Sequence, residues 1–148
     1  MAEEQSKKIK GHKDLKVWKK SMDIVESIYK DTARFPKEEI YGITAQMRRA
    51  AVSIPLNIAE GVACNGRKEF VQLLFIALGS LSELETQIII AKRLDYIHEI
   101  DSLLNDCSTI KKLLNGLVIS LTRKLLSHRL LLATVTLLLF TYYISPLL

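Results

Sequence analysis

Apolar residues recur at intervals of three and four positions along most of this chain, which is the spacing of one face of an α-helix. Four segments show this spacing, at about 14–33, 41–64, 67–93 and 99–125. In the third and fourth segments, steps of four and three alternate regularly, as they do in the seam of a left-handed helical bundle. Because the connections between the segments are short, the pattern predicts an all-α, up-down-up-down four-helix bundle.

The second segment, Tyr41–Gly61, has two apolar faces when its residues are placed at intervals of about 100°. A helix of this kind is expected to be buried on more than one side, inside a bundle or between subunits. Because the apolar stripe keeps its phase across Pro55, one kinked helix is predicted rather than two helices meeting at Ile54. The first apolar stripe contains Ile43, Met47, Ala50, Ile54 and Ile58, and the second contains Ala45, Val52, Leu56 and Ala59. The polar seam between them consists of Gln46, Arg49, Ser53, Asn57 and Glu60.

In the first segment one stripe is formed by Leu15, Trp18, Met22, Val25 and Tyr29. This stripe is predicted to face a partner helix, with Trp18 as an anchor in the core.

Small residues and a cysteine also lie at informative positions. Gly79 and Ser80 of the third segment are expected to let a neighbouring helix approach closely. Cys107 lies on the apolar seam of the fourth segment and is predicted to be a buried, unreactive thiol. Cys64 lies far from it in sequence, and no metal-binding spacing joins the two, so free thiols in a reducing cytoplasm are expected.

The chain carries a net charge of +5, which suits an anionic partner such as nucleic acid or a membrane surface. For each cationic residue, ordinary solvated charge is the alternative to phosphate binding. Arg49 has a further alternative, a hydrogen-bonded network along the polar seam that fixes the register of helices or subunits. The candidate nucleic-acid-binding residues are Lys7, Lys8, Lys10, Lys13, Lys16, Lys19, Lys20, Arg48, Arg49, Arg67 and Lys68.

Residues that carry enzymatic chemistry are scattered in this sequence. His12, His98 and His128 have neither the HExxH spacing nor a carboxylate spaced for a metal site. Glu83 and Glu85 point in different directions on a helix, so they do not form an acid–base pair. A glycine-rich phosphate loop is also missing from the sequence. A non-catalytic protein that uses no cofactor and no metal is therefore predicted.

The last 19 residues, Leu130–Leu148, contain no charged side chain. A helix of that length measures about 28 Å, which is close to the roughly 30 Å hydrocarbon core of a bilayer. Three interpretations remain open: a C-terminal membrane anchor, an extra packed helix, or a sequence accident such as a shifted reading frame. The chain is thus divided into a basic arm (1–13), a bundle (14–125) and an apolar tail (126–148).

Several specific sequence blocks carry a family resemblance. In these blocks the chain resembles the bacterial four-helix-bundle family known as the S23 ribosomal protein, or 23S rRNA intervening-sequence protein, family. It is also similar to the accessory variability protein of diversity-generating retroelements. The blocks are Asp14-Leu15-Lys16-Val17-Trp18, Arg34-Phe35-Pro36-Lys37-Glu38-Glu39, YGITAQMRRAAVSIPLNIAEG, Lys68-Glu69-Phe70 and Ala77-Leu78-Gly79-Ser80-Leu81-Ser82-Glu83-Leu84-Glu85-Thr86.

The resemblance implies a protomer that assembles into a homopentamer with a basic surface and binds nucleic acid. For the retroelement branch it also implies contact with a reverse transcriptase. The tail after Thr122 does not belong to the usual family pattern. The expected function is a non-catalytic, oligomeric scaffold that binds the backbone of RNA or DNA. The alternative is a structural protein–protein interaction bundle, with or without a membrane anchor in its tail.

Overall fold

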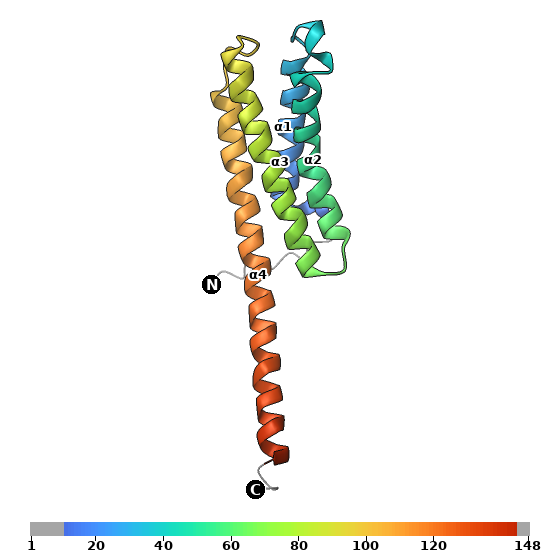
Figure 1. Ribbon diagram of the computed structural model, residues 1–148, viewed down its shortest axis with the longest axis vertical. Coiled ribbons are helices and arrows are strands. Elements are labelled where there is room, and N and C mark those ends of the chain that lie inside the picture. The colour runs from blue at the N-terminus through green and yellow to red at the C-terminus, as the bar shows by residue number, and fades with distance from the viewer. Residues whose placement is uncertain (1–10, 145–148) are drawn as a thin grey trace, which may run out of the picture.

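The computed structural model describes the backbone of residues 11–144 and the side chains of residues 11–123. Four long helices, α1 (Lys16–Thr32), α2 (Ile43–Ala63), α3 (Arg67–Arg93) and α4 (Asp101–Ile144), alternate in direction, as Figure 1 shows. Two short 3-10 turns, η1 (His12–Asp14) and η2 (Lys37–Ile40), precede α1 and α2. Helix α2 packs against α1 and α3, and α4 packs against α3 and α1. The predicted all-α four-helix bundle is confirmed.

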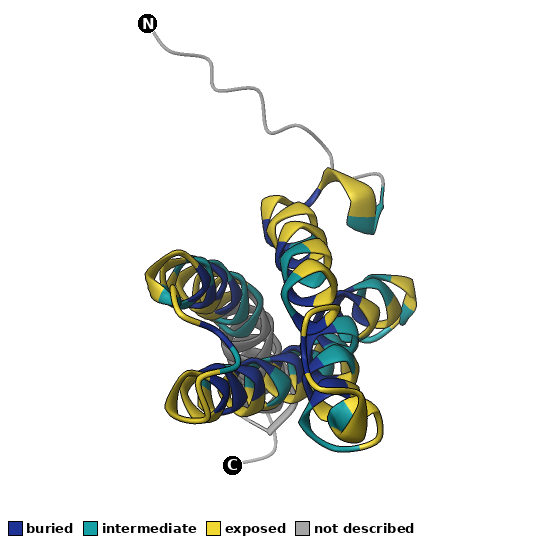
Figure 2. Ribbon diagram, turned by 90° about the horizontal axis from the view of Figure 1, so that it is seen from above, coloured by how far each residue is buried: buried dark blue, intermediate teal, exposed yellow. Residues whose placement is uncertain are grey.

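The core lies between the helices, and buried residues line their inner sides in Figure 2. The first apolar stripe of α2 is part of this core, because Met47, Ile54 and Ile58 are fully buried. The seam predicted for α3 is also buried, with Leu74, Leu84 and Ile88 at its centre. Helix α4 contributes Cys107, Ile110 and Leu114. The heptad pattern of α3 and α4 therefore identified their core faces correctly.

The core face of α1 differs from the predicted one. The buried stripe consists of Val17, Ser21, Ile24, Ile28 and Thr32, whereas Met22 and Tyr29 are exposed and Trp18 is only partly buried. Hydrogen bonding explains the difference, because the Ser21 hydroxyl donates to the Val17 carbonyl oxygen at 2.7 Å. The Thr32 hydroxyl likewise donates to the Ile28 carbonyl oxygen at 2.7 Å. Since their donors are satisfied by the backbone, these residues can be buried at little cost.

Pro55 lies inside α2, which continues from Ile43 to Ala63 as one helix. Proline has no N–H, so the Ala51 carbonyl lacks its usual partner four residues later. Pro55 is itself buried. The prediction of one helix rather than two is confirmed.

The expected close approach at Gly79 is not found, because a Cβ built there meets no atom within 4 Å. Gly79 is exposed on the outer side of α3. Its neighbour Ser80 faces α2 instead, where its hydroxyl lies 2.8 Å from that of Ser53. One residue along a helix turns the side chain by about 100°, which separates the environments of these two adjacent residues.

Helix α4 is longer than the sequence pattern predicted. It was expected to end near residue 125, but it continues to Ile144. Residues 122–144 contain neither proline nor glycine, so the sequence offers no stop signal before Pro146. In Figure 1 the later half of α4 extends beyond the other three helices. The tail side chains, on which the three interpretations of this segment depend, lie outside the described residues.

Helix α3 is long and apolar enough to cross a membrane by length and composition alone, the one such helix within the described side chains. However, its residues Leu74, Leu84 and Ile88 are fully buried in the bundle. Core helices of globular domains meet the same criterion.

Candidate nucleic-acid interface and interhelical groove

Arg48 is held against the C-terminal end of α1. Its Nε donates a hydrogen bond to Thr32 Oγ1 at 2.9 Å, and its guanidinium carbon lies 4.7 Å from the centre of the Tyr29 ring. Both contacts restrict the side chain, which is half-buried. Arg48 therefore joins α2 to α1, and it is less available to a phosphate than an exposed arginine.

The polar seam of α2 divides into an inner and an outer part. In the inner part, Asn57 Nδ2 donates to the Ser53 carbonyl oxygen at 2.8 Å and to Ser53 Oγ at 3.0 Å. Ser53 in turn bonds Ser80 of α3, so this part connects two helices. The outer part, Gln46, Arg49 and Glu60, is exposed, and its side chains form no hydrogen bond or ion pair within residues 11–123. Arg49 thus presents its charge to solvent.

The lysines at the start of α1 are all exposed, but they are not equivalent. The ammonium of Lys20 lies 3.8 Å from an oxygen of Asp23 and 3.9 Å from one of Asp106. Lys13, Lys16 and Lys19 are exposed without an ion pair in the described part of the chain. Three further candidates, Lys7, Lys8 and Lys10, lie outside the described residues.

One end of the bundle brings cations from three helices together. A cavity of about 460 Å³ there is lined by Leu15 at the start of α1, by Gly66 and Arg67 at the α2–α3 turn, and by Leu121 of α4. The exposed cations of this end, here called the basic end, are Lys13, Lys16, Arg67, Lys68 and Arg123. The carboxylates beside them are Asp14, Glu60 and Glu69. Cations therefore outnumber carboxylates at this end.

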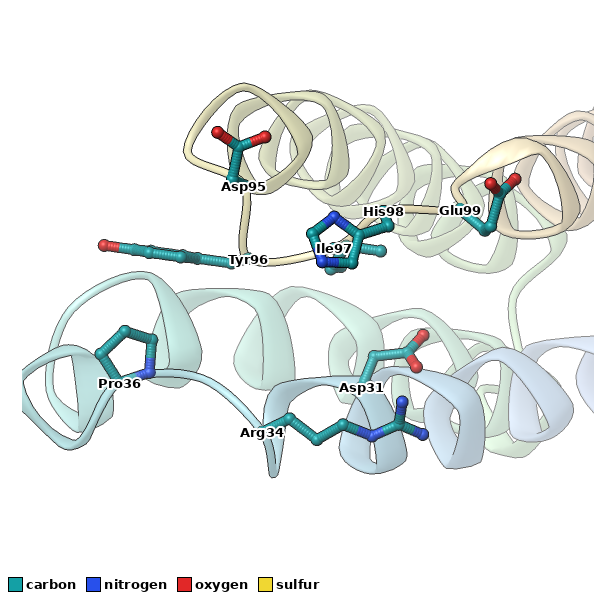
Figure 3. Close-up of a pocket in the computed structure, with 8 residues that line it drawn as sticks. All are labelled: Asp31, Arg34, Pro36, Asp95, Tyr96, Ile97, His98 and Glu99. Atoms are coloured by element: carbon teal, nitrogen blue, oxygen red, sulfur yellow. The ribbon is translucent and has the colours of Figure 1, made fainter.

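The opposite end of the bundle has no such excess of cations. There the α1–α2 connection and the α3–α4 loop surround a cavity of about 500 Å³, and Figure 3 shows Asp31 and Arg34 on one side of it and the loop residues Asp95–Glu99 on the other. The cations of this end are Lys30, Arg34, Lys37, Arg48, Lys92 and Arg93, and the carboxylates are Asp31, Glu38, Glu39, Asp95, Glu99 and Asp101. The excess positive charge at the two ends of the bundle is therefore confined to the basic end.

Contacts at this second end are structural. The Tyr96 hydroxyl donates to Glu39 Oε1 at 3.3 Å, and Glu39 Oε2 accepts the Ile43 N–H at 3.2 Å at the start of α2. Desolvation and the nearby Glu39 carboxylate raise the pKa of Tyr96. The Tyr96 ring also packs against Phe35 with centroids 5.3 Å apart. These contacts attach the α3–α4 loop to the N-terminus of α2, where a carboxylate is favoured by the helix dipole.

An apolar groove of about 350 Å³ runs between α1 and α2. Its most exposed large residue is Leu56, with 61% of its surface accessible. The groove combines the second apolar stripe of α2 with the stripe of α1 that was predicted to face the core. Its lining residues, here called the α1–α2 groove, are His12, Trp18, Met22, Val25, Val52, Pro55, Leu56 and Ala59.

The two cysteines are free and differ in environment. Cys107 is buried in the core, and desolvation, with smaller contributions from Glu85 and Asp106, raises its pKa to about 12. Cys64 is half-buried near the α2–α3 turn. Among the described residues, His, Cys, Asp and Glu side chains form no group of three or more suited to a metal ion.

Comparison with known proteins gives a match to a family model and matches to solved structures. A family model described as 23S rRNA-intervening sequence protein matches residues 13–116. A crystal structure of a protein of unknown function from the S23 ribosomal protein family of Bacteroides thetaiotaomicron is similar, with a TM-score of 0.64 and 28% sequence identity. The similarity covers 69% of this chain and 97% of that chain. The search of curated proteins found no match.

Proposed function

This chain belongs to the 23S rRNA-intervening sequence protein family, and we propose that it is a non-catalytic, oligomeric scaffold that binds the phosphate backbone of RNA or DNA. The observation that carries the proposal is the excess of cations at one end of the bundle. Cations of α1, the α2–α3 turn and α4 share the basic end, while cations and carboxylates are equal in number at the other end.

The chemistry of the basic end suits backbone contacts rather than base readout. Lys16, Arg67 and Lys68 are exposed and have no ion pair with another described residue, so their charge is available to a phosphate. Each phosphate that is neutralised releases counterions, which lowers the logarithm of the binding constant by about 0.7 to 0.9 per tenfold rise in salt. Binding should therefore weaken steeply with salt and depend little on sequence.

Assembly is supported by the α1–α2 groove. An apolar surface that includes Leu56 and Met22 is costly to expose, and covering it with a second protomer removes it from water. In a ring with cyclic symmetry every protomer presents its basic end in an equivalent orientation. Several basic ends on one particle would raise the avidity for a long nucleic acid.

Nucleic-acid binding is tested by fluorescence anisotropy with a labelled RNA between 50 and 300 mM KCl. Arg67→Ala/Lys68→Ala should weaken binding and make the salt slope shallower by about 0.7 to 0.9 for each lost contact. The matched control, Lys37→Ala/Arg93→Ala, removes the same charge from the opposite end and should bind nearly as the unaltered chain does. Absence of binding at the lowest salt, or equal losses in both variants, would contradict the proposal.

Assembly is tested by light scattering coupled to size-exclusion chromatography. Leu56→Glu should convert the oligomer to a monomer that retains its helical circular dichroism. Ile119→Glu is the matched control, since Ile119 is 57% exposed but lies on α4 outside the α1–α2 groove. A chain that is already monomeric, or two variants with the same mass as the original, would rule out assembly through this groove.

A structural protein–protein interaction bundle is the second candidate, and the apolar character of the α1–α2 groove favours it. The two experiments distinguish the candidates. An oligomer that depends on Leu56 but does not bind RNA or DNA at low salt supports this second function instead of the first.

A further inference from the structure

Helix α4 has two parts with different surroundings. Residues such as Cys107, Ile110 and Leu114 are buried against the other helices. Beyond Thr122 the helix continues to Ile144 and extends away from the bundle in Figure 1. From residue 130 onward the sequence contains no charged side chain. Most residues of this segment are apolar, although Thr134, Thr136 and Thr141 interrupt them, and a predominantly apolar helix is stable only where its surface is removed from water.

The helix leaves the bundle at its basic end. Leu121 of α4 lines the same cavity as Leu15 and Arg67, so the exit point lies beside the start of α1 and the α2–α3 turn. Arg123 is exposed there, and Lys124 and Arg129 follow in the sequence. The fold thus adds Lys16, Arg67 and Lys68 from other helices to the basic flank of the uncharged segment. Basic residues beside an apolar helix are attracted to anionic lipid headgroups.

The spacing along α4 also fits a bilayer. From Arg123 to Arg129 the helix rises about 9 Å at 1.5 Å per residue. The headgroup region on one side of a bilayer is about 5–8 Å thick. If residue 130 lies at the edge of the hydrocarbon, the cations of the basic end lie at the outer surface of the headgroups, within about one Debye length of their charge.

We propose that the uncharged part of α4 inserts into a lipid bilayer while the basic end of the bundle rests on anionic headgroups of the adjacent leaflet. This interaction goes beyond the proposed function and does not require it. It has one consequence for that function, because lipid phosphates occupy the same cations, Arg67 and Lys68, that would bind nucleic acid. Membrane binding and nucleic-acid binding at this end therefore compete.

The insertion is tested by flotation of the full-length chain with vesicles of phosphatidylcholine alone or with 30% phosphatidylglycerol. Leu138→Arg places a charge near the middle of the uncharged segment and should lower partitioning into both kinds of vesicle by about a hundredfold. Leu138→Ala is the matched control and should float nearly as the original does. A chain that stays at the bottom of the gradient with both kinds of vesicle, or a Leu138→Arg variant that floats equally well, overturns the proposal.

The role of the basic end is tested with the same vesicles. Arg67→Ala/Lys68→Ala should reduce partitioning into anionic vesicles by about thirtyfold, on the basis of roughly fivefold for each cation near the surface. Partitioning into neutral vesicles should not change. Lys37→Ala/Arg93→Ala, at the opposite end, should have no effect on either. Equal effects of the two double variants would overturn the proposed orientation.

Self-association of the tail is the competing outcome. A full-length chain that forms tail-dependent oligomers without lipid, and does not float, overturns the membrane proposal. Nucleic-acid binding is measured separately on a chain ending at Thr122. That shortened chain retains all of the residues that match the family model, 13–116. The similar solved structure aligns over 97% of its own length to only 69% of this chain. The bundle is therefore expected to fold without the tail. Failure of insertion and failure of nucleic-acid binding can therefore be told apart.

Discussion

The ring of Phe70, in the first turn of α3, packs directly on Gly61 in the last turn of α2. A Cβ built on Gly61 would lie 2.8 Å from Cε2 of the ring and closer still to Cδ2. Gly61 is buried, and the contact sets how closely the two helices approach next to their connecting turn. Glycine is required here by lack of space, since its backbone has an ordinary helical conformation.

Gly61→Ala should destabilise the protein by about 1–2 kcal/mol. Overpacking costs about 1–3 kcal/mol, and the higher helix propensity of alanine offsets up to about 1 kcal/mol of this. Gly116→Ala is the control, because a Cβ at Gly116 meets no atom within 4 Å and should stabilise α4 slightly. Urea unfolding measures both. If Phe70→Leu does not relieve the effect of Gly61→Ala, the steric explanation is wrong.

The adjacent arginines of α2 should respond differently to substitution. Arg48→Ala removes the bond to Thr32 and the contact with the Tyr29 ring, and should cost about 1–3 kcal/mol of folding free energy. Arg49→Ala should change stability by less than about 0.5 kcal/mol, since its side chain is exposed. Thermal unfolding of the two variants compares them directly. Equal destabilisation would show that Arg49 has structural contacts in solution.

Asp95, after the end of α3, is a non-glycine residue with a positive φ of 57°. The N–H of Asp95 bonds the Lys92 carbonyl oxygen at 3.1 Å, and the N–H of Tyr96 bonds that of Ala91 at 2.9 Å, which is the Schellman arrangement. Because this backbone conformation costs an L-residue about 1 kcal/mol, Asp95→Gly should stabilise the protein by roughly 0.5–1 kcal/mol. Asp95→Ala retains the conformational cost of a positive φ and should not stabilise the protein. Chemical denaturation of both variants measures the difference.

The buried thiol of Cys107 should make stability depend on alkaline pH. Its pKa is about 12 in the folded protein and near 9 when exposed, so between these values the unfolded chain releases a proton that the folded chain retains. Stability should therefore be unaffected by this group below about pH 9 and decrease as pH rises from 9 towards 12. Urea midpoints at pH 8, 9 and 10 should decrease more in the original chain than in Cys107→Ala. Identical pH dependence would exclude this origin.

The same burial predicts selective chemistry of the two thiols. At pH 8 iodoacetamide should modify Cys64 in the folded protein, because its side chain is half-buried rather than enclosed. Cys107 should react only after unfolding in urea. Mass spectrometry of the digested protein locates the label. Modification of both cysteines at the same rate without denaturant would show that the core opens readily.

The heptad seams of α3 and α4 and the first stripe of α2 could be assigned from the sequence because burial there is almost purely apolar. The spacing of apolar residues such as Leu74, Leu84 and Ile110 predicts the buried face, and these three residues are fully buried. In α1 the spacing of apolar residues predicted the wrong core face. Ser21 and Thr32 are buried there, with their hydroxyls hydrogen-bonded to carbonyl oxygens of the preceding turn. A polar residue that satisfies its donor within its own helix resembles a surface residue in sequence.

By itself, therefore, the sequence determined the helical class, the single helix through Pro55 and the presence of a second apolar face on α2. These depend on local periodicity, which is a property of neighbouring residues. Only the tertiary structure decided that Trp18 and Leu56 line one groove, and that Leu15, Arg67 and Leu121 line one cavity. Such pairings arise from the up-down path of the chain, which brings residues distant in sequence to one end, and no local pattern encodes them.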